Sequence, residues 1–351
     1  MQGVRLAPYT TLRLGGPAKA FATARTDEEI VRLVADADRA GEPVLVLGGG
    51  SNLVIADEGF DGLVVHVATT GVRVTEDGDR VLVTAAAGED WDALVRRCVA
   101  EGWSGVECLS GIPGLVGSTP IQNVGAYGQD VSQTIRSVRV YDRRRAEVLE
   151  LPAERCGFSY RHSAFKAALD RYVVLDVTYA LERSPLSGPI GYAELANRLG
   201  VSDGDRVPLE QARQAVLELR RGKGMVLDPD DPDTCSAGSF FTNPVLTAEQ
   251  AAELELRAPG YPRWRMPDGT VKVPAAWLIE HAGFPKGYRR GPVRISTKHT
   301  LALTHPGGRG GPDERATAAD LLALAIEVRD GVEAKFGVRL VNEPVMVGLS
   351  L

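Results

Sequence analysis

A run of three glycines after a short apolar segment constrains this chain more than any other feature. Val44–Leu47 is predicted to be a buried strand, and Gly48-Gly49-Gly50-Ser51-Asn52 follows it directly, before Leu53. Consecutive glycines permit positive φ values and let a ligand approach the backbone closely. Successive N–H groups, with Ser51 and Asn52 as further donors, can form an anion-binding concavity that suits a pyrophosphate.

The glycine loop differs from the two best-known phosphate loops. A dinucleotide-binding Gly-x-Gly-x-x-Gly sequence would need a glycine where Leu53 stands, and a P-loop would end in Gly-Lys-Ser or Gly-Lys-Thr. A plain tight turn is the alternative interpretation of this segment.

A second segment, Cys108–Gly128, is rich in Gly, Pro, Ser and Asn and is predicted to be a loop, too irregular for a helix or a regular strand. Its polar side chains offer donors and acceptors, and its apolar residues offer a bed for a ring. A flavin needs both, so we expect Ser110–Gly128 to hold a flavin. A structural Ω-loop is the alternative.

Apolar periodicity predicts regular elements along the rest of the chain. Thr26-Asp27-Glu28-Glu29 is a capping-box sequence, and Gly41 is expected to end the helix that it begins. Further helices are expected at Trp91–Glu101, Leu209–Arg221, Thr247–Arg257, Pro274–Ala282 and Thr317–Phe336. Strands are expected at Leu63–Val67, Val72–Thr75, Arg80–Ala85, Ser137–Tyr141, Glu147–Leu151, Tyr172–Leu181 and Val338–Val347.

Composition excludes several classes of protein. The net charge of −6 argues against a nucleic-acid-binding protein. No apolar run approaches the roughly 20 residues of a membrane helix, and the N-terminus lacks the apolar core of a signal peptide, so a cytoplasmic protein is expected. The cysteines and histidines are widely spaced, which predicts neither a metal site nor a disulfide framework.

The two loops, together with six further segments in the same order, resemble the UDP-N-acetylenolpyruvoylglucosamine reductase family. The resemblance implies an α+β protein with an FAD-binding fold of the vanillyl-alcohol-oxidase/PCMH type and a separate α+β substrate-binding domain. It also implies noncovalent FAD, and NADPH as co-substrate. The segments are Leu47–Leu53, Gly111–Gly128, Tyr160–Ser163, Gly191-Tyr192, Arg220–Lys223, Ala237–Pro244, Ala275–Ile279 and Leu340–Gly348.

Three parts of the chain are expected. Residues 1–70, rejoined by 339–351, are predicted to be the first FAD-binding subdomain, and 71–219 the second. Residues 220–338 are predicted to form the C-terminal substrate-binding domain. A monomer is expected.

The resemblance implies reduction of UDP-N-acetylglucosamine enolpyruvate to UDP-N-acetylmuramate in peptidoglycan precursor synthesis. Ser239 would supply the proton, while Arg161 and Glu343 would polarise the substrate carboxylate. Arginine suits this task because its planar fork can bind a carboxylate through two hydrogen bonds. A surface Arg–Glu ion pair and a helix-capping serine are the alternatives.

Further contacts are implied for the cofactor and the substrate. Those for FAD are Leu47, Gly48, Gly49, Gly50, Ser51, Asn52, Leu53, Gly117, Ser118, Pro120, Ile121, Gln122, Asn123, Gly125, Ala126 and Tyr127. Those for the sugar nucleotide are Tyr160, Tyr192, Lys223 and Asn243. Tyr192 resembles the subgroup with a tyrosine loop that closes over the substrate. The alternatives are a solvated helix C-terminus for Lys223 and an Asx turn before Pro244 for Asn243.

The chain departs from the family pattern at three places. Asp228–Asp233 is an acidic linker, Pro344-Val345-Met346 stands where many members carry Val-Arg-Phe, and His281 stands where a glutamine is often found. Two other classes of protein are the alternatives, a flavin oxidase of the same fold and a non-catalytic nucleotide-binding module. The absence of a histidine from Gly48–Leu53 argues against an oxidase with covalently attached flavin, and the set of Arg161, Ser239 and Glu343 argues against the module.

Overall fold

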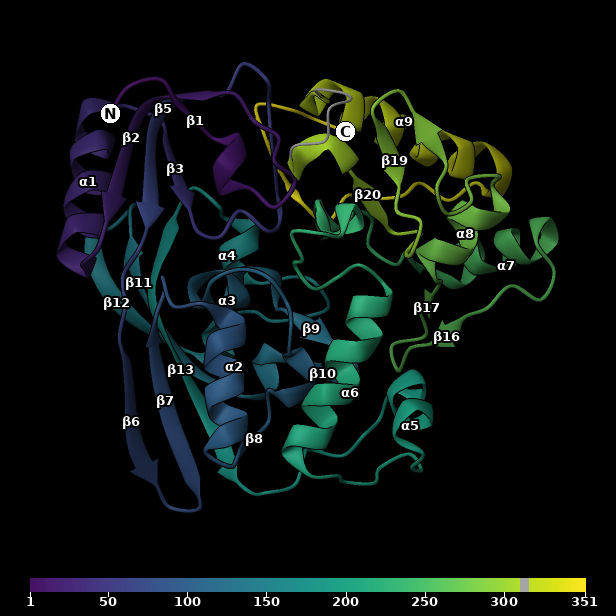
Figure 1. The fold of residues 1–351 in the computed structure, drawn as a ribbon, viewed down its shortest axis with the longest axis horizontal. Coiled ribbons are helices and arrows are strands. Elements are labelled where there is room, and N and C mark those ends of the chain that lie inside the picture. The colour runs from purple at the N-terminus through teal and green to yellow at the C-terminus, as the bar shows by residue number, and fades with distance from the viewer. Residues whose placement is uncertain (310–315) are drawn as a thin grey trace. The chain divides into compact units, whose positions relative to one another are not determined.

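The computed structural model describes residues 1–309 and 316–351 (Figure 1). The chain divides into two compact units, each built from several segments. Unit 1 consists of Met1–Val4, Ala18–Gly49 and Asp61–Gly222. Unit 2 consists of Arg5–Pro17, Gly50–Phe60 and Lys223–Leu351. The three-part division expected from the sequence stays a prediction.

The regular elements are numbered in chain order. The helices are α1 (Asp27–Ala40), α2 (Trp91–Ala100), α3 (Thr119–Gln122), α4 (Ala164–Ala167), α5 (Ala193–Leu199), α6 (Leu209–Gly222), α7 (Ala248–Arg257), α8 (Ala275–His281) and α9 (Ala318–Phe336). Short 3-10 helices are η1 (Ala7–Tyr9), η2 (Glu107–Leu109), η3 (Val116–Ser118), η4 (Val131–Gln133), η5 (Ala153–Arg155), η6 (Pro232–Thr234) and η7 (Pro306–Arg309).

The strands of the first half are longer than those of the second. They are β1 (Val4–Arg5), β2 (Pro17–Ala24), β3 (Val44–Leu47), β4 (Leu53–Ile55), β5 (Phe60–Val67), β6 (Val72–Asp77), β7 (Arg80–Ala86), β8 (Trp103–Ser104), β9 (Gly125–Ala126), β10 (Gln129–Asp130), β11 (Ile135–Asp142), β12 (Glu147–Pro152) and β13 (Tyr172–Arg183). The later ones are β14 (Ser236–Ser239), β15 (Val245–Leu246), β16 (Trp264–Arg265), β17 (Val271–Lys272), β18 (Arg289–Arg290), β19 (Val293–Ile295), β20 (Ala302–Thr304) and β21 (Val345–Val347).

Unit 1 contains two sheets. The smaller has the order β1-β2-β5-β3 (Figure 1), in which β3 pairs with β5 in parallel. The helix α1 leads into β3 and contacts it. The larger has the order β12-β11-β13-β7-β6, its pairs are antiparallel, and β8 joins it at the end of β13. The glycine loop therefore leaves the smaller sheet at the carboxyl end of β3.

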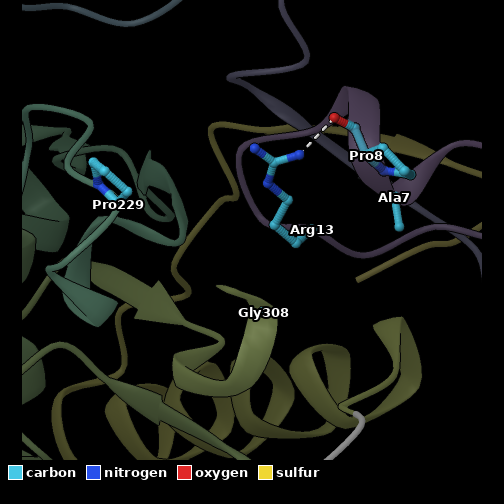
Figure 2. Close-up of a pocket in the computed structure, with 5 residues that line it drawn as sticks. All are labelled: Ala7, Pro8, Arg13, Pro229 and Gly308. Atoms are coloured by element: carbon cyan, nitrogen blue, oxygen red, sulfur yellow. Dashed lines mark hydrogen bonds between the residues drawn. The ribbon is translucent and has the colours of Figure 1, made fainter. Parts of the chain in front are cut away.

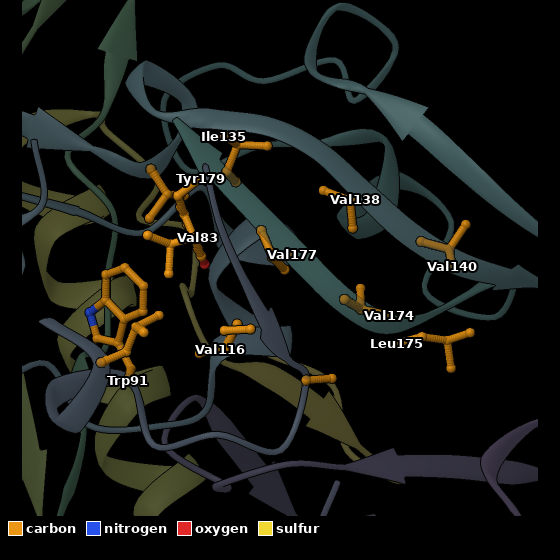
Figure 3. Close-up of a cluster of buried hydrophobic side chains, with 14 of the residues drawn as sticks. Val83, Trp91, Val116, Ile135, Val138, Val140, Val174, Leu175, Val177 and Tyr179 are labelled. Carbon is orange, nitrogen blue, oxygen red and sulfur yellow. The ribbon is translucent and has the colours of Figure 1, made fainter. Parts of the chain in front are cut away.

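Apolar side chains from the larger sheet and α2 form the core of unit 1 (Figure 3). Trp91 at the start of α2 lies 5.6 Å from Tyr179 of β13, measured between ring centroids, and both are buried. Trp91 Nε1 donates a hydrogen bond to Leu109 O at 3.2 Å, and Tyr179 Oη shares one with Thr119 Oγ1 at 2.7 Å. Since Leu109 and Thr119 lie near the start and the middle of the second predicted loop, Cys108–Gly128, the core anchors that loop at two points.

The helix at residues 27–40 confirms most of the predicted start signal. Thr26 Oγ1 accepts a hydrogen bond from Glu29 N at 3.2 Å, and Gly41 ends α1 with φ 67°. The carboxylate of Glu29 accepts from Arg25 N at 2.7 Å instead of from Thr26 N, so the capping box is not reciprocal.

The prediction that Cys108–Gly128 contains no helix is wrong. Residues Thr119–Gln122 form the helix α3, preceded by η3. Pro120 lies in its first turn, where a proline costs no hydrogen bond and its fixed φ suits the helix. Asn123 ends α3 with φ 44°, a left-handed conformation that asparagine tolerates.

A buried carboxylate at the end of β11 joins the turn that follows β11 to the residue that precedes β13. Asp142 is fully buried, and its oxygens accept hydrogen bonds from Arg171 Nη2 at 2.7 Å, Arg171 Nε at 3.1 Å and Arg144 N at 3.0 Å. The bonds from Arg171 hold the pKa of Asp142 below its ordinary value, although burial alone would raise that pKa.

We expect Asp142 to contribute to acid unfolding. A depressed folded-state pKa adds stability that is complete above the unfolded pKa, about 3.9, and is lost as pH falls through the folded value. The free energy of unfolding should therefore fall below about pH 4. Urea titrations of the wild type and Asp142→Asn at several pH values test this. Stability curves that stay parallel in acid would contradict it.

Unit 2 is built around α9. Its sheets have the orders β14-β20-β19-β18 and β15-β17-β16, and β21 pairs with β4 in parallel. Leu321, Val328 and Val332 of α9 are fully buried in one apolar cluster. The N-terminus of α9 carries a capping box from Thr317, and Asp57 accepts hydrogen bonds from Ala318 N at 2.8 Å and Ala319 N at 3.0 Å.

The predicted terminal strand, Val338–Val347, is too long. Only Val345–Val347 forms a strand, paired with Leu53–Ile55 directly after the glycine loop. The chain changes partner before it: Glu343 N donates to Phe240 O at 2.8 Å, and Val345 N donates to Asn52 O at 2.9 Å. This segment forms backbone hydrogen bonds first with Phe240 and then with Asn52, so it cannot pair continuously with one strand. The strand therefore begins only at Val345.

Candidate active site

The two predicted loops pack against each other within unit 1. A Cβ atom on Gly48 would lie 3.1 Å from Ser118 Oγ, and one on Gly49 would lie 2.9 Å from Gly114 Cα. Gly117 approaches the core as closely, because its Cβ would lie 2.6 Å from Ala87 Cβ. Glycine is therefore required at Gly49, which packs on backbone atoms, and at Gly117, which packs on Ala87, while Gly48 makes a less tight contact with side chains.

Gly50 continues the loop in unit 2, where φ is 60°. A Cβ atom there would lie only 2.0 Å from Tyr9 O. Its carbonyl oxygen accepts hydrogen bonds from Thr11 N at 3.2 Å and Thr11 Oγ1 at 3.4 Å. The segment Tyr9–Thr11 was not predicted to contact the loop, although the glycine pair that follows at Gly15-Gly16 is a signal of close backbone packing in this region.

The second loop holds a buried amide that the described protein does not satisfy. Gln122 lies at the end of α3 and is 8% exposed, and neither Oε1 nor Nε2 has a hydrogen-bond partner in the described residues. The neighbouring Asn123 is satisfied, since its Nδ2 donates to Ser159 O at 3.0 Å and its Oδ1 accepts from Ser132 N at 3.2 Å. Buried polar groups without partners are uncommon and call for a ligand or water.

These features fit FAD. The glycine loop has three successive residues without side chains, whose backbone N–H groups can form the concave anion site that a pyrophosphate requires. The Gln122 amide offers one acceptor and two donors beside a buried loop, which matches the alternating polar atoms at the edge of a flavin ring.

Arg161 holds a strained position in unit 1. Its φ is 54°, its Nη2 donates to Gly125 O at 2.8 Å and its Nη1 donates to Asn123 O at 3.4 Å. Its guanidinium also lies over the Tyr160 ring, 5.5 Å from the centroid. A left-handed non-glycine residue costs free energy, so the fold holds this arginine against a local preference.

A second arginine lies in the same electrostatic neighbourhood. Burial lowers the pKa of Arg220, on the last turn of α6, to about 10, while Tyr127 and Asp92 raise it and Arg161 lowers it further. Two cationic groups, one of which lowers the pKa of the other, favour an anionic ligand near them. Arg220 lies in one of the segments that resemble the family, but it was not among the predicted site residues.

The two predicted tyrosines contact each other in unit 1. The rings of Tyr127 and Tyr192 meet edge to face, with 5.4 Å between centroids and 84° between planes. Burial raises the pKa of Tyr127 to about 12 and also raises the pKa of Tyr192. Both phenols therefore stay protonated at neutral pH and can donate hydrogen bonds.

Unit 2 brings together three segments that are far apart in sequence. Ser239 is the last residue of β14, and the next residue, Phe240, accepts a hydrogen bond from Glu343 N at 2.8 Å. Asn52 Nδ2 donates to Glu343 O at 3.4 Å. Ser239 ends a strand, so the helix-capping alternative is wrong. Arg161 lies in the other unit.

The remaining substrate predictions fall on positions with clear structural roles. Asn243 Oδ1 accepts a hydrogen bond from Ala275 N at 2.9 Å at the start of α8, instead of forming an Asx turn before Pro244. Lys223 is half-buried directly after α6. His281 stacks on Trp277 with 3.9 Å between ring centroids, which leaves its ring on the surface of α8.

The acidic linker has a defined path. Asp233 is buried, and its Oδ1 accepts hydrogen bonds from Arg294 Nη2 and Thr297 N, both at 3.2 Å. Asp231 pairs with Lys298 at 2.6 Å. The linker is thus tied to the turn after β19, and these two carboxylates are occupied by structural bonds.

A pocket of about 450 Å³ lies elsewhere in unit 2 (Figure 2). Its lining includes Arg13, whose Nη1 donates to Pro8 O at 2.7 Å. None of the predicted site residues lines it. The lining residues are Ala7, Pro8, Arg13, Pro229 and Gly308.

Comparison with known proteins decides the family. Residues 18–151 match the FAD binding domain family, and residues 230–347 match the C-terminal domain of UDP-N-acetylenolpyruvoylglucosamine reductase. The UDP-N-acetylenolpyruvoylglucosamine reductase of Thermobifida fusca is 59% identical over 361 residues, which cover 100% of this chain and 98% of that protein. The chain belongs to the UDP-N-acetylenolpyruvoylglucosamine reductase family.

Other relatives agree with this assignment. The reductase of Streptomyces coelicolor is 57% identical over 354 residues, which cover 99% of this chain and 90% of that protein. The crystal structure of the reductase from Thermus caldophilus superposes with a TM-score of 0.67 at 26% identity, covering 99% of this chain and 98% of the other. The predicted α+β fold with an FAD-binding domain of the vanillyl-alcohol-oxidase/PCMH type is thereby confirmed.

Family membership fixes the class of chemistry. The chain is an FAD-dependent oxidoreductase of peptidoglycan precursor synthesis, as the sequence predicted. No helix in the part of the chain that the structure describes is long and apolar enough to cross a membrane. The roles of individual residues are proposals.

Proposed function

We propose that this protein reduces UDP-N-acetylglucosamine enolpyruvate to UDP-N-acetylmuramate with NADPH, through noncovalent FAD, as a cytoplasmic monomer. One observation carries the assignment of residues. In unit 2 the backbone joins Asn52 of the glycine loop, the strand end at Ser239 and the segment at Glu343. The relatives named above are reductases of the corresponding enolpyruvyl compound by their names.

The residues of both loops would hold FAD. The backbone N–H groups of Gly48, Gly49 and Gly50 would bind the pyrophosphate. The unsatisfied Gln122 amide would bond to the ring edge. FAD, when bound and reduced, supplies a hydride. No histidine stands in Gly48–Leu53 to attach a flavin covalently.

The protein must control the charge that develops when hydride adds to the enolpyruvyl carbon remote from the carboxylate. Negative charge then builds beside the carboxylate, and donors fixed in advance stabilise it by about 3–4 kcal/mol for each well-placed group. Arg161 is suited to this because its fork is permanently charged and its position is fixed by the bonds to Gly125 O and Asn123 O. Glu343 would act at the same carboxylate.

Ser239 would deliver the proton to the carbon next to the carboxylate. Its position at the end of β14 is fixed by pairing with Ala302 and by the bond between Phe240 O and Glu343 N. Lys223, Asn243, Tyr160 and Tyr192 would contact the sugar nucleotide, and Tyr192 offers a protonated phenol to its diphosphate.

Anaerobic flavin titration tests this function. The purified protein should be yellow, NADPH should bleach it, and one equivalent of the enolpyruvyl sugar nucleotide should restore the oxidised spectrum without oxygen. A colourless protein that does not bind added FAD would contradict the proposal. Rapid reoxidation by oxygen alone, with no response to the sugar nucleotide, would instead favour a flavin oxidase.

A further inference from the structure

A buried carboxylate outside the proposed catalytic set anchors the substrate-facing part of unit 1. Glu107 of η2 is 0% exposed, and no ion pair links it to a cation in the described residues. Its Oε1 accepts hydrogen bonds from Gly188 N at 2.6 Å and Gln129 Nε2 at 2.8 Å, and its Oε2 accepts one from Gly105 N at 2.7 Å. An unpaired buried charge is costly, so these three donors must stay in place.

Gln129 carries this anchor into a short hairpin. Its Oε1 accepts from Cys108 N at 2.8 Å, so both ends of its amide are fixed. Gln129 pairs with Ala126 in the hairpin Gly125–Asp130. The two turn residues, Tyr127 and Gly128, have φ values of 50° and 86°. Positive φ at both turn positions is typical of a tight type I′ hairpin, whose shape is well defined.

The hairpin lies between two residues of the proposed site. Arg161 Nη2 donates to Gly125 O at its base, and the Tyr127 ring at its tip packs edge-on against Tyr192. The segment that leads to Tyr192 starts at Gly188, which Glu107 binds directly. Glu107 therefore holds both the hairpin and the Tyr192 segment through a single carboxylate.

We propose that Glu107, acting through Gln129 and Gly188, is a positioning residue that fixes the Gly125–Asp130 hairpin between Arg161 and Tyr192. The proposal rests on the proposed function in one respect, since it takes Arg161 and Tyr192 as substrate contacts. Glu107 itself is buried away from solvent and acts only through the groups it holds.

Glu107→Gln is the informative substitution. It keeps the shape, but its NH₂ group must face either Gly105 N or both Gly188 N and Gln129 Nε2, so at least one of the three bonds is lost. A neutral amide oxygen is also a weaker acceptor than a carboxylate, so the bond to Gly188 N is weakened in either orientation. We expect KM for the enolpyruvyl sugar nucleotide to rise about tenfold, as for the loss of one hydrogen bond to a charged group, with kcat within about twofold of wild type. Hydrogen exchange at Gly188 N should become faster. Gln129→Met should act in the same direction.

Asp142→Asn is the matched control. Asp142 is an equally buried carboxylate in unit 1, at the opposite end of β11 from the hairpin, about 23 Å along the strand from Ile135. It should lower stability without raising KM or the exchange rate at Gly188.

The outcomes separate the two proposals. Unchanged exchange at Gly188 in Glu107→Gln, or faster exchange with unchanged KM, would overturn the positioning role while the reductase function stands. An equal rise of KM in Asp142→Asn would also overturn it, because general loosening would then explain the effect. Wild-type protein that does not turn over the sugar nucleotide overturns the function, whereas the exchange measurement still reports on the anchor.

Discussion

Replacing Ser239 with alanine is expected to lower turnover of the enolpyruvyl sugar nucleotide by about 100- to 10,000-fold, the range typical of a lost general acid. Bleaching of the flavin by NADPH should continue at nearly the wild-type rate, because that step does not need the proton. Ser239 is half-buried at the end of a strand whose pairing involves backbone atoms, so the substitution should leave the fold intact. Stopped-flow absorbance separates the two half-reactions.

Ser296→Ala is a suitable control for this substitution. Ser296 lies directly after β19 in the same sheet and is buried, and its Oγ accepts hydrogen bonds from Lys298 N at 3.0 Å and His299 N at 3.2 Å. Its loss should cost some stability, about 1 kcal/mol, and leave both half-reactions unchanged. Full turnover in Ser239→Ala would remove this serine as proton donor.

Gly50→Ala is expected to remove bound FAD from the purified protein. The new Cβ would lie 2.0 Å from Tyr9 O, and alanine would also be held at φ 60°. The loop has to move to relieve the contact, and its N–H groups would leave the positions that we propose for the pyrophosphate. The ratio of flavin to protein absorbance should drop at least about tenfold, and the melting temperature should fall.

Gly41→Ala is the control that separates the steric clash expected at Gly50 from the cost of a left-handed backbone conformation. Gly41 has φ 67°, close to that of Gly50, but nothing lies within 4 Å of its Cβ position. It should therefore cost only the left-handed conformation, about 1–2 kcal/mol, and keep its flavin. Retention of FAD by Gly50→Ala at wild-type affinity would show that this glycine is not needed for the site.

The longer helices could be predicted because their pattern of apolar residues repeats over several turns. The helices at Trp91–Ala100, Leu209–Gly222 and Ala318–Phe336 agree with the predicted bounds to within a residue. Apolar residues at 3.6-residue spacing, with a capping residue at one end, fix such helices locally. The short strands of unit 2, such as Val293–Ile295, were missed because three residues carry no period that differs from a loop.

Part of the candidate site was also visible in the sequence. The glycine triplet was expected to bind a pyrophosphate and Ser110–Gly128 a flavin ring, and the structure packs Gly48 and Gly49 on that second segment. Tyr9–Thr11 was not predicted as a partner of Gly50, because the close contact with Tyr9 O and the bond from Thr11 N involve backbone atoms, which residues of any type present. Glu107 was not predicted either, because its carboxylate accepts hydrogen bonds from residues up to 81 positions away in the sequence.

The sequence by itself determined the family, the flavin and the longer helices, because each depends on residues that are close together or on motifs in a fixed order. Only the tertiary structure decided where the C-terminal strand begins, because that depends on the change of partner from Phe240 to Asn52. It also decided that Gln122 is left with unsatisfied polar atoms and that one buried carboxylate holds the hairpin beside Arg161. Burial and hydrogen-bond satisfaction are properties of the packed chain, so no local pattern reports them.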